Sequence, residues 1–282
     1  MKKFLIILTV IIVIISSVFI YNGVLNSQIE ITQYTVRSQK LPKNFNGYKI
    51  AFISDFHNSD LYNEAVQAIK TIEPDVIIFG GDMINVNESD YLNTKKLIQG
   101  IDTLAPIYMV TGNHEIFNPE WSKHIKLEFG ELGVRVIDIS EIFLTRGHEK
   151  IRVYGMQDPA VSDEELASGS WTDEWADLAG SSYDESMFNL LLCHRANYFP
   201  RLSQYKYDLI LSGHMHGGLW RLPWVGGIVS PDRKTFFPEY TEGRYKSDTT
   251  EMIVSRGCDK DLSRSRLFNP PEILQITLKC KD

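Results

Sequence analysis

The sequence has few cysteines and no excess of basic residues. Three cysteines among 282 residues are too few, and odd in number, for a disulfide framework. Lys and Arg number 29 against 36 Asp and Glu, and the net charge of −7 argues against a nucleic-acid-binding surface. Internal repeats and linker-like segments are also absent. The length and apolar content therefore predict one large α/β domain, or two small ones, with a full hydrophobic core.

Long hydrophobic runs are absent except at the N-terminus. There, two lysines precede an uncharged run from Phe4 to Ile20, at the short end of the roughly 17–25 residues that span a bilayer. The run is either a cleaved signal peptide or a retained anchor, and the lack of an Ala-x-Ala-like site favours an anchor over residues 1–24. Both lysines lie before the run, and no Lys or Arg follows until Arg37. The positive-inside bias therefore predicts a single-pass protein of the cell membrane with an extracytoplasmic domain.

A strand and helix rhythm begins beyond a tether and edge strand predicted over residues 25–47, and it predicts one domain over residues 48–282. Apolar strands at 49–54, 75–80 and 106–112 alternate with helical patterns at 61–72, 91–101 and 119–132. This order implies parallel pairing with helices packed on the sheet. Further strands follow at 134–139, 142–147, 151–156, 188–194, 207–213, 252–256 and 272–278. An acidic stretch over 158–185 is interpreted as a surface insert or short helix. Two β-rich layers flanked by helices are the expected architecture.

Side chains that bind metals stand at the ends of five of these strands. In open α/β sheets, ligands gather at the carboxyl ends of the strands. The side chains delivered there are Asp55, His57, Asp82, Asn113, His114, Glu115, His194, His214 and His216. Carboxylates, an amide oxygen and imidazoles together suit two divalent ions such as Mn²⁺, Fe²⁺ or Zn²⁺. In an extended strand, the outer residues of Asp-x-His and His-x-His would face one side and reach a single small site.

Each of these residues has an ordinary structural alternative. Alone, Asp55 or Asp82 would cap a following helix, His194 would be a buried core histidine, and Asn113 would be a turn residue. Their joint occurrence, in order at five strand ends, favours a metal site. By contrast, Cys193 is interpreted as a buried core thiol, because no basic group is placed to lower its pKa.

The ordered blocks resemble those of the calcineurin-like metallophosphoesterases. They stand here as Asp55-Phe56-His57, Gly81-Asp82, Gly112-Asn113-His114-Glu115, His194 and Gly213-His214-Met215-His216. The resemblance spans about residues 48 to 278 and looks closest to a membrane-associated bacterial branch that includes enzymes acting on UDP-2,3-diacylglucosamine. It implies a four-layer α/β/β/α fold. It also implies one ion held by Asp55, His57 and His216, a second held by Asn113, His194 and His214, Asp82 bridging both, and His114 as general acid or transition-state donor.

Two-metal chemistry then defines the expected reaction. Ions roughly 3.5–4 Å apart would hold phosphate oxygens and lower the pKa of a bridging water, so that hydroxide is the expected nucleophile. Glu115 would either orient His114 or serve as a helix-start carboxylate. A catalytically silent domain that binds metal or a partner is the alternative, and it is disfavoured because the ligands and His114 are all present. A phosphomonoester, a phosphodiester and the pyrophosphate of a nucleotide-linked lipid all stay open as substrates, since an outward-facing domain would not meet cytoplasmic UDP-lipids.

A tryptophan-containing stretch, "GGLWRLPWVGGIVSP", directly follows His216. It places Trp220 and Trp224 around Arg221 in a segment rich in glycine and proline. Indoles at headgroup depth and a cation near anionic lipid suit a membrane interface. The alternative is that these side chains close the core beneath a β-hairpin. The expected partners are thus a phosphoester substrate, lipid-linked in this interpretation, and the membrane, contacted by the N-terminal helix and by this loop.

Overall fold

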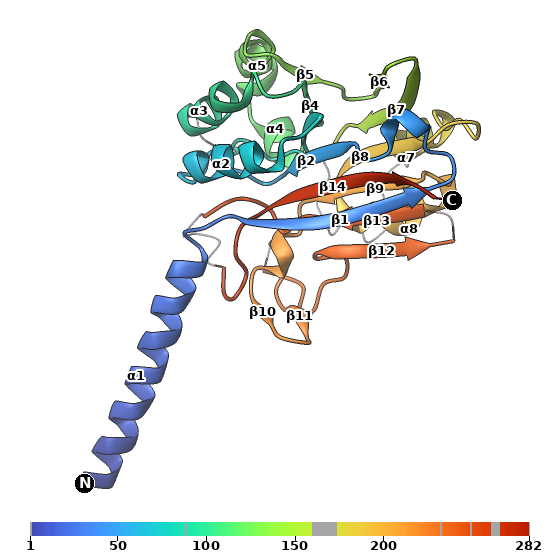
Figure 1. The fold of residues 1–282 in the computed structure, drawn as a ribbon. Coiled ribbons are helices and arrows are strands. Elements are labelled where there is room, and N and C mark those ends of the chain that lie inside the picture. Colours follow the sequence, from blue (N-terminus) through green and yellow to red (C-terminus); the bar gives the residue numbers. More distant parts are fainter. Residues whose placement is uncertain are drawn as a thin grey trace.

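Two six-stranded mixed sheets pack face to face and organise the chain (Figure 1). The structure, a computed structural model, describes residues 2–87, 89–159, 174–231, 233–248, 250–260 and 266–281. The first sheet has the strand order β1 (Glu30–Ser38), β14 (Glu272–Cys280), β2 (Lys49–Ile53), β3 (Val76–Phe79), β4 (Ile107–Met109) and β5 (Val134–Val136). The second has the order β12 (Gly243–Ser247), β13 (Thr250–Val254), β9 (Leu209–Gly213), β8 (Asn189–Arg195), β7 (Glu149–Met156) and β6 (Ser140–Arg146).

Alternating strands and helices build the first sheet, as the sequence predicts. Strands β2 to β5 pair in parallel. The helices between them are α2 (Tyr62–Ile72), α3 (Leu92–Ile101), the short α4 (Asn113–Phe117) and α5 (Lys126–Glu131). A π-helical turn at Trp121–Ile125 precedes α5, so the helix expected over 119–132 begins at Trp121 and not at Pro119. The reason is local: the Glu120 N–H donates to Asn118 Oδ1, which holds residues 118–120 in a turn.

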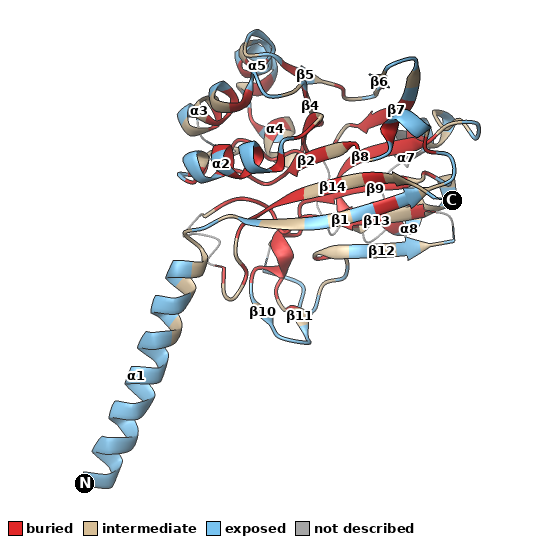
Figure 2. Cartoon of the chain, in the orientation of Figure 1, coloured by how far each residue is buried: buried red, intermediate tan, exposed pale blue. Residues whose placement is uncertain are grey.

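Helices cover the outer face of each sheet and complete a four-layer α/β/β/α fold, which confirms the expected fold class. Side chains of α2, α3 and α5 pack on the outer face of the first sheet, around Ile53 and Phe79. Apolar side chains from both sheets, among them Phe52 and Leu211, fill the space between the two sheets. The outer face of the second sheet is covered by α7 (Glu174–Ser181) and α8 (Phe199–Leu202). Figure 2 shows the central strands as the most buried part of the chain.

Two predicted segments lie at the margins of this core. β1, within residues 25–47, forms the edge of the first sheet and pairs in parallel with β14 along its whole length. For the acidic stretch over 158–185, the expected short helix is present as α7. Residues 160–173 of that stretch lie outside the described residues.

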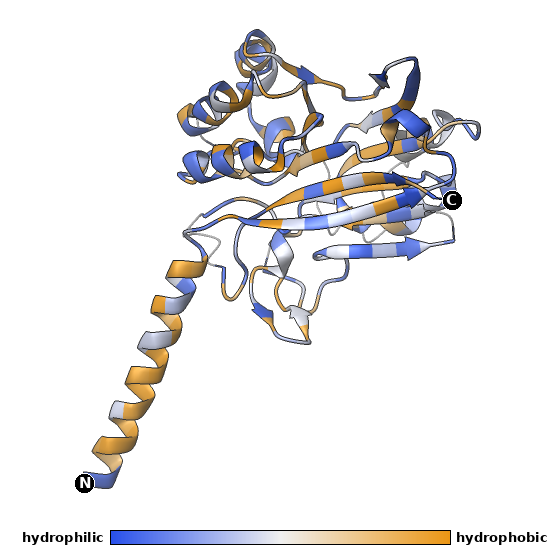
Figure 3. Cartoon of the chain, viewed as in Figure 1, coloured by the Kyte–Doolittle hydropathy of each residue, from blue (hydrophilic) through white to orange (hydrophobic). Residues whose placement is uncertain are grey.

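The N-terminal helix α1 (Lys2–Leu25) extends away from the sheets (Figure 1). Its apolar window has a mean hydropathy of 3.0 and none of it is buried by the rest of the chain. Figure 3 shows that hydrophobic residues predominate along α1. Within the described residues, α1 is the one helix long and apolar enough to cross a membrane, so a single span is possible at this end of the chain.

A small hairpin of β10 (Arg221–Leu222) and β11 (Gly226–Gly227) projects on the side from which α1 extends (Figure 1). Apolar side chains of the tryptophan-containing stretch differ in exposure: Leu219 is buried, whereas Trp220, Leu222, Trp224 and Val225 are exposed, with Trp224 fully so. The core-closing alternative therefore applies to Leu219 but not to the tip of the hairpin.

The interpretation of Arg221 as an exposed, lipid-facing cation is wrong. Its guanidinium points inward, where Nη1 donates to the Gly217 carbonyl at 2.7 Å and Nη2 pairs with Glu242. Only 12% of the Arg221 side chain is exposed, so the guanidinium is held by these two acceptors and does not face a lipid surface.

Candidate metal centre

The five motif-bearing strand ends meet in one place, but the motifs themselves are not extended. Asp55, His57, Asp82, His214 and His216 all have positive φ, between 45° and 71°. The Asp55 N–H donates to the Gly81 carbonyl at 2.9 Å and the His57 N–H to the Asp82 carbonyl at 3.0 Å. The expected same-side placement in a strand is thus wrong, and convergence comes from left-handed turns held by main-chain bonds. Non-glycine residues in this conformation cost energy and gather at functional sites.

The first cluster joins Asp55, His57 and His216. One potential ligand atom from each lies within 4.8 Å of the others. His57 Nε2 is 3.3 Å from His216 Nε2, and His216 Nε2 is 3.4 Å from Asp55 Oδ1. All three side chains are buried. Two imidazole nitrogens and a carboxylate oxygen that face one small volume suit a divalent transition-metal ion.

The second cluster joins Asp82, His194 and His214, again within 4.8 Å. His194 Nδ1 donates a hydrogen bond to the Gly80 carbonyl at 2.8 Å. This bond turns His194 Nε2 toward Asp82 Oδ2, which lies 3.2 Å away. Asn113, the first residue of α4, has a buried Oδ1 that accepts no hydrogen bond. A buried amide oxygen without a partner is costly unless a ligand satisfies it, and a cation would do so.

Asp82 lies between the two clusters. Its Oδ2 is 3.2 Å from His194 Nε2 and 3.8 Å from His57 Nε2, and its Oδ1 accepts the His114 main-chain N–H at 2.8 Å. Although burial alone would raise it, the imidazoles of His194, His114 and His57 hold the pKa of Asp82 well below its ordinary value. Burial likewise opposes a proton on His194, but the carboxylates of Asp82 and Asp55 raise its pKa to about 10. A site whose negative field favours positive charge this strongly fits divalent cations.

Two glycines make room for this arrangement. A Cβ on Gly112 would lie 2.3 Å from Asp82 Oδ1, and one on Gly213 would lie 2.4 Å from Asp55 Oδ2. Both contacts are far shorter than non-bonded atoms tolerate. Glycine at these positions therefore lets the main chain approach the carboxylates closely.

Glu115 has a role that the sequence left open. It is fully buried, and its carboxylate accepts four main-chain N–H groups, from Gly112, Asp82, Met83 and Ile84, at 2.7–3.2 Å. It acts as the helix-start carboxylate, not as the partner that orients His114. Burial and the nearby Asp82 carboxylate raise the pKa of Glu115 to about 8, and the main-chain donors oppose that rise. Glu115 thus fixes the turn that carries Asp82.

Replacing Glu115 with alanine should destabilise the fold as well as the site. Four buried N–H groups would lose their acceptor, at roughly 1–3 kcal/mol each before water enters, so the free energy of unfolding should fall by about 3 kcal/mol or more. Urea denaturation measures this loss. The matched control is Glu120→Ala, which removes a half-buried carboxylate that pairs with the exposed Lys123 and His124 and should leave stability near the original value. Equal stability of both variants would contradict the role assigned to Glu115.

Asp259 and Arg266 support the site without local sequence signals. Asp259 Oδ1 lies 3.1 Å from His216 Nδ1 and accepts Arg266 Nε at 3.0 Å. Burial alone would raise it, yet Arg266 and His216 hold the pKa of Asp259 well below its ordinary value. On the other side, Arg195 pairs with Asp158 at 2.8 Å and places Nη1 3.5 Å from His214 Nε2. A carboxylate partner such as Asp259 fixes the orientation of a ligating histidine.

His114 stands at the open side of the site, with 18% of its side chain exposed. Its Nδ1 accepts the Val86 main-chain N–H at 3.1 Å, and its Nε2 lies 3.9 Å from Asp82 Oδ2. Because Nδ1 is occupied as an acceptor, a neutral imidazole must carry its proton on Nε2. The ring therefore presents an N–H donor to the space beside Asp82. Its neighbour in the site, His57, lies edge-on at 4.4 Å between ring centroids.

Comparison with known proteins places this chain in a defined family. Residues 48–218 match the Calcineurin-like phosphoesterase family, and the chain belongs to that family. It is 30% identical over 267 residues to the uncharacterized metallophosphoesterase YkuE of Bacillus subtilis, across 89% of this chain and 86% of the relative. It is 23% identical to phosphodiesterase YaeI of Escherichia coli, across 82% of each. A dimetal phosphatase from Danio rerio is similar in structure, with 10% identity, a TM-score of 0.48, and coverage of 75% of this chain and 88% of that one.

The chain is therefore a metallophosphoesterase, an enzyme that hydrolyses phosphoester bonds, as the sequence predicts. The family generally depends on two metal ions, and the neighbouring groups of Asp and His side chains, which overlap at His57 and Asp82, fit that requirement. The alternative of a catalytically silent domain is not supported.

Proposed function

We propose that this enzyme hydrolyses phosphoester or pyrophosphate bonds with two divalent ions, and that its substrate is presented at a membrane surface. When bound, the ion pair supplies Lewis-acid contacts to phosphate oxygens and a water of lowered pKa. The residues that would hold the ions, Mn²⁺, Fe²⁺ or Zn²⁺ by their ligand types, are Asp55, His57 and His216 for one, Asn113, His194 and His214 for the other, and Asp82 for both.

His114 is the proposed catalytic residue. Its Nε2–H faces the space beside Asp82, and the Val86 main-chain N–H keeps the ring in that orientation. A donor placed there can neutralise charge that develops on a phosphoryl oxygen or protonate the departing oxygen. The candidate ligands Asp55, His57, Asp82, His194, His214 and His216 are buried, whereas His114 is partly exposed, so substrate would reach the site from the His114 side.

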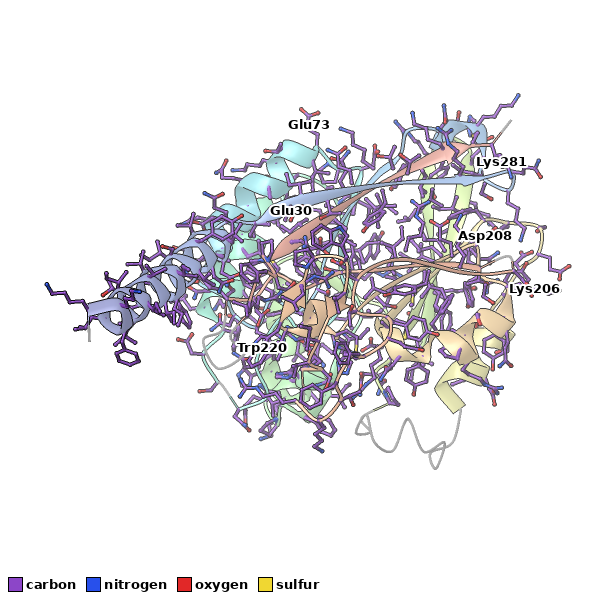
Figure 4. The ribbon with its side chains drawn as sticks, turned by 90° about the horizontal axis from the view of Figure 1, so that it is seen from below. Glu30, Glu73, Lys206, Asp208, Trp220 and Lys281 are labelled. Atoms are coloured by element: carbon purple, nitrogen blue, oxygen red, sulfur yellow. The ribbon has the colours of Figure 1, made fainter. Side chains whose placement is uncertain are left out.

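The observation that supports a membrane-presented substrate is the contact between α1 and residues 266–268, which lie next to the site. Asn22, just beyond the apolar run that ends at Ile20, donates to the Arg266 carbonyl at 2.7 Å. Trp220 is bridged to Leu267 in the same segment, and the Arg221 N–H donates to the Leu267 carbonyl at 2.9 Å. The hairpin thus starts at the level where α1 would leave the bilayer, and Trp220 lies at the α1 end of the domain (Figure 4).

The hairpin also connects this membrane level to the metal centre. His216 begins a 3₁₀ turn (His216–Gly218), and β10 follows three residues after it ends. Exposed apolar side chains continue along the hairpin at Trp220, Leu222, Trp224 and Val225 and nearby at Phe236 and Phe237. A lipid whose phosphate entered the site would leave its acyl chains against this surface. We therefore favour a lipid-linked phosphoester as substrate.

The domain is proposed to be extracytoplasmic. Lys2 and Lys3 precede the apolar run, and the helix has no basic residue in its last turn. The positive-inside bias then leaves the N-terminus in the cytoplasm. Protease added to intact cells should cleave the domain if this orientation holds, and should spare it if the orientation is reversed.

A hydrolysis panel tests the proposed reaction. The purified full-length protein would be loaded separately with Mn²⁺, Zn²⁺, Fe²⁺ or Mg²⁺ and given phosphomonoesters, phosphodiesters and pyrophosphates, each as a soluble and as a lipid-linked compound. Metal-dependent turnover that is fastest on a lipid-linked compound is the expected result. Turnover of soluble compounds alone would refute the membrane-presented substrate, and no turnover with any loaded metal would refute the reaction.

Removing both hairpin indoles should separate lipid from soluble substrates. The double variant Trp220→Ala/Trp224→Ala should lower kcat/KM on a vesicle-borne lipid phosphoester by about tenfold or more, which corresponds to roughly 1.4 kcal/mol of lost interfacial contact. Its activity on a soluble chromogenic phosphoester should stay near the original value. Phe143→Ala, which removes an exposed aromatic on the distant edge strand β6, is the matched control. Equal losses on both substrates would indicate a folding defect and end the lipid-facing assignment.

A further inference from the structure

We infer that the last turn of α1 is a positioning element of the metal centre, acting on His216 through Arg266 and Asp259. The inference rests on the proposed assignment of His216 as a metal ligand. It concerns residues of the anchor that lie outside the matched family region, residues 48–218.

The first step is the attachment of α1 to the segment at 266–268. Asn22 Nδ2 and Asn26 Nδ2 both donate to the Arg266 carbonyl, at 2.7 and 3.0 Å. In return, the Phe268 N–H donates to Asn22 Oδ1 at 2.8 Å. These side chains do not cap their own helix. They reach a segment more than two hundred residues away in sequence, and they fix its main chain on both sides of Leu267.

The second step runs through the Arg266 side chain. Arg266 is buried, and its guanidinium contacts the Asp259 carboxylate through Nε at 3.0 Å and through Nη2. Two donors from one planar group hold a carboxylate more firmly than a single point charge would. Because the Arg266 main chain is fixed by α1, the guanidinium has a defined starting point from which to reach Asp259.

The third step is the orientation of His216. Asp259 Oδ1 lies 3.1 Å from His216 Nδ1, on the opposite side of the ring from the first cluster. With Nδ1 held there, His216 Nε2 is directed at Asp55 Oδ1 and at His57 Nε2. Loss of such a partner typically lowers metal affinity by about 10–100-fold. The chain of contacts therefore makes retention of the ion at the first cluster depend on the docked state of α1.

This arrangement has a consequence for the anchored enzyme. Asn22 and Asn26 lie just past the apolar run, where α1 would meet the headgroups. In a chain whose anchor is inserted and docked, Arg266 holds Asp259, and Asp259 holds His216 in the orientation of a metal ligand. A chain whose anchor is displaced keeps its ligands but holds the first ion less firmly.

The test measures metal release from the full-length protein in detergent micelles, loaded with Mn²⁺ and mixed with excess EDTA. In Asn22→Ala/Asn26→Ala, one of two ions should leave at least about tenfold faster, while the other leaves at the original rate. Thr9→Ala is the matched control, because its hydroxyl bonds only to the Leu5 carbonyl within α1. Thermal unfolding of each variant shows whether the fold is intact.

Coupling to Asp259 makes the test specific. Asp259→Asn alone should release the same ion faster. Combining it with Asn22→Ala/Asn26→Ala should produce no further increase in the release rate. The inference would be overturned if Asn22→Ala/Asn26→Ala released both ions at the rates of the unsubstituted protein, or if its effect added to that of Asp259→Asn. Either result would leave the proposed function intact. An unsubstituted protein that binds fewer than two ions would instead overturn the proposed function, and the inference with it.

Discussion

Replacing Asp82 with asparagine is expected to abolish hydrolysis and to weaken the binding of both ions. Asp82 Oδ2 faces His194 Nε2 and His57 Nε2, which belong to different clusters, so one substitution removes negative charge from both. The amide oxygen of asparagine can still accept the His114 main-chain N–H, which Asp82 Oδ1 accepts at 2.8 Å, so the fold should survive. Activity should fall by about a thousandfold or more, at or beyond the upper end of the roughly 10²–10³-fold loss seen when one electrostatic stabiliser of a transition state is removed, because both ions are affected.

Isothermal titration with Mn²⁺ and steady-state kinetics measure these two effects together. Asp102→Asn, an exposed carboxylate at the end of α3, is the matched control and should bind and turn over like the unsubstituted protein. Full activity of Asp82→Asn with two ions bound would show that Asp82 does not bridge. Loss of only one ion would assign Asp82 to a single cluster.

Replacing His114 should separate metal binding from catalysis. His114→Asn places an amide oxygen near the position of Nδ1, which allows the Val86 N–H to keep an acceptor, and it removes the Nε2–H that faces the site. The variant should keep two ions, because no ligand is lost, while kcat falls by roughly 10²–10³-fold through loss of a transition-state donor. Metal analysis and kcat on a soluble phosphoester give the two readouts.

His124→Asn is the matched control for this prediction. His124 is an exposed histidine of the π-helical turn, paired with Glu120 and remote from both clusters. It should change neither metal content nor kcat. An ion lost from the His114 variant would mean that His114 coordinates metal, and an unchanged kcat would remove it from the catalytic machinery.

The layered fold follows from the sequence because its strands and helices have strong, separate periodicities. The apolar runs at β2, β3 and β4 and the amphipathic helices between them could be assigned without any tertiary information. By contrast, β12 was missed. Its residues "GRYKS" alternate between half-buried and exposed at the edge of the second sheet, so no apolar run announces it. The β10–β11 hairpin is too short to produce a pattern at all.

The candidate site, like the fold, could be predicted from the sequence only in part. Within each sheet the motif residues could be brought together from sequence, because they lie at or just beyond the carboxyl ends of neighbouring parallel strands. The meeting of the two sets depends on how the two sheets pack, which the sequence does not show. The backbone conformation of these residues could not be predicted from sequence, since the positive φ of Asp55 and His57 depends on main-chain hydrogen bonds to the neighbouring loop at Gly81 and Asp82. Asp259 also gave no signal, because its contact with His216 joins positions far apart in the chain.

Arg221 illustrates the limit of reading charge from sequence. Flanked by exposed apolar residues, it was assigned to the lipid surface, yet its guanidinium turns toward Glu242 and the Gly217 carbonyl. Glu242 lies 21 residues away in the sequence but pairs with Arg221 in the folded chain, and this contact cannot be seen in the local sequence. The sequence left exposure and burial of Trp224 open, and the structure shows it fully exposed at the tip of the hairpin.

The central claim is that two ions share Asp82, and anomalous diffraction from crystals of the Mn²⁺-loaded protein tests it most directly. The account predicts two anomalous peaks on either side of the Asp82 carboxylate. One should lie among Asp55, His57 and His216, and the other among Asn113, His194 and His214. A single peak, or two peaks of which either lies away from Asp82, would contradict it.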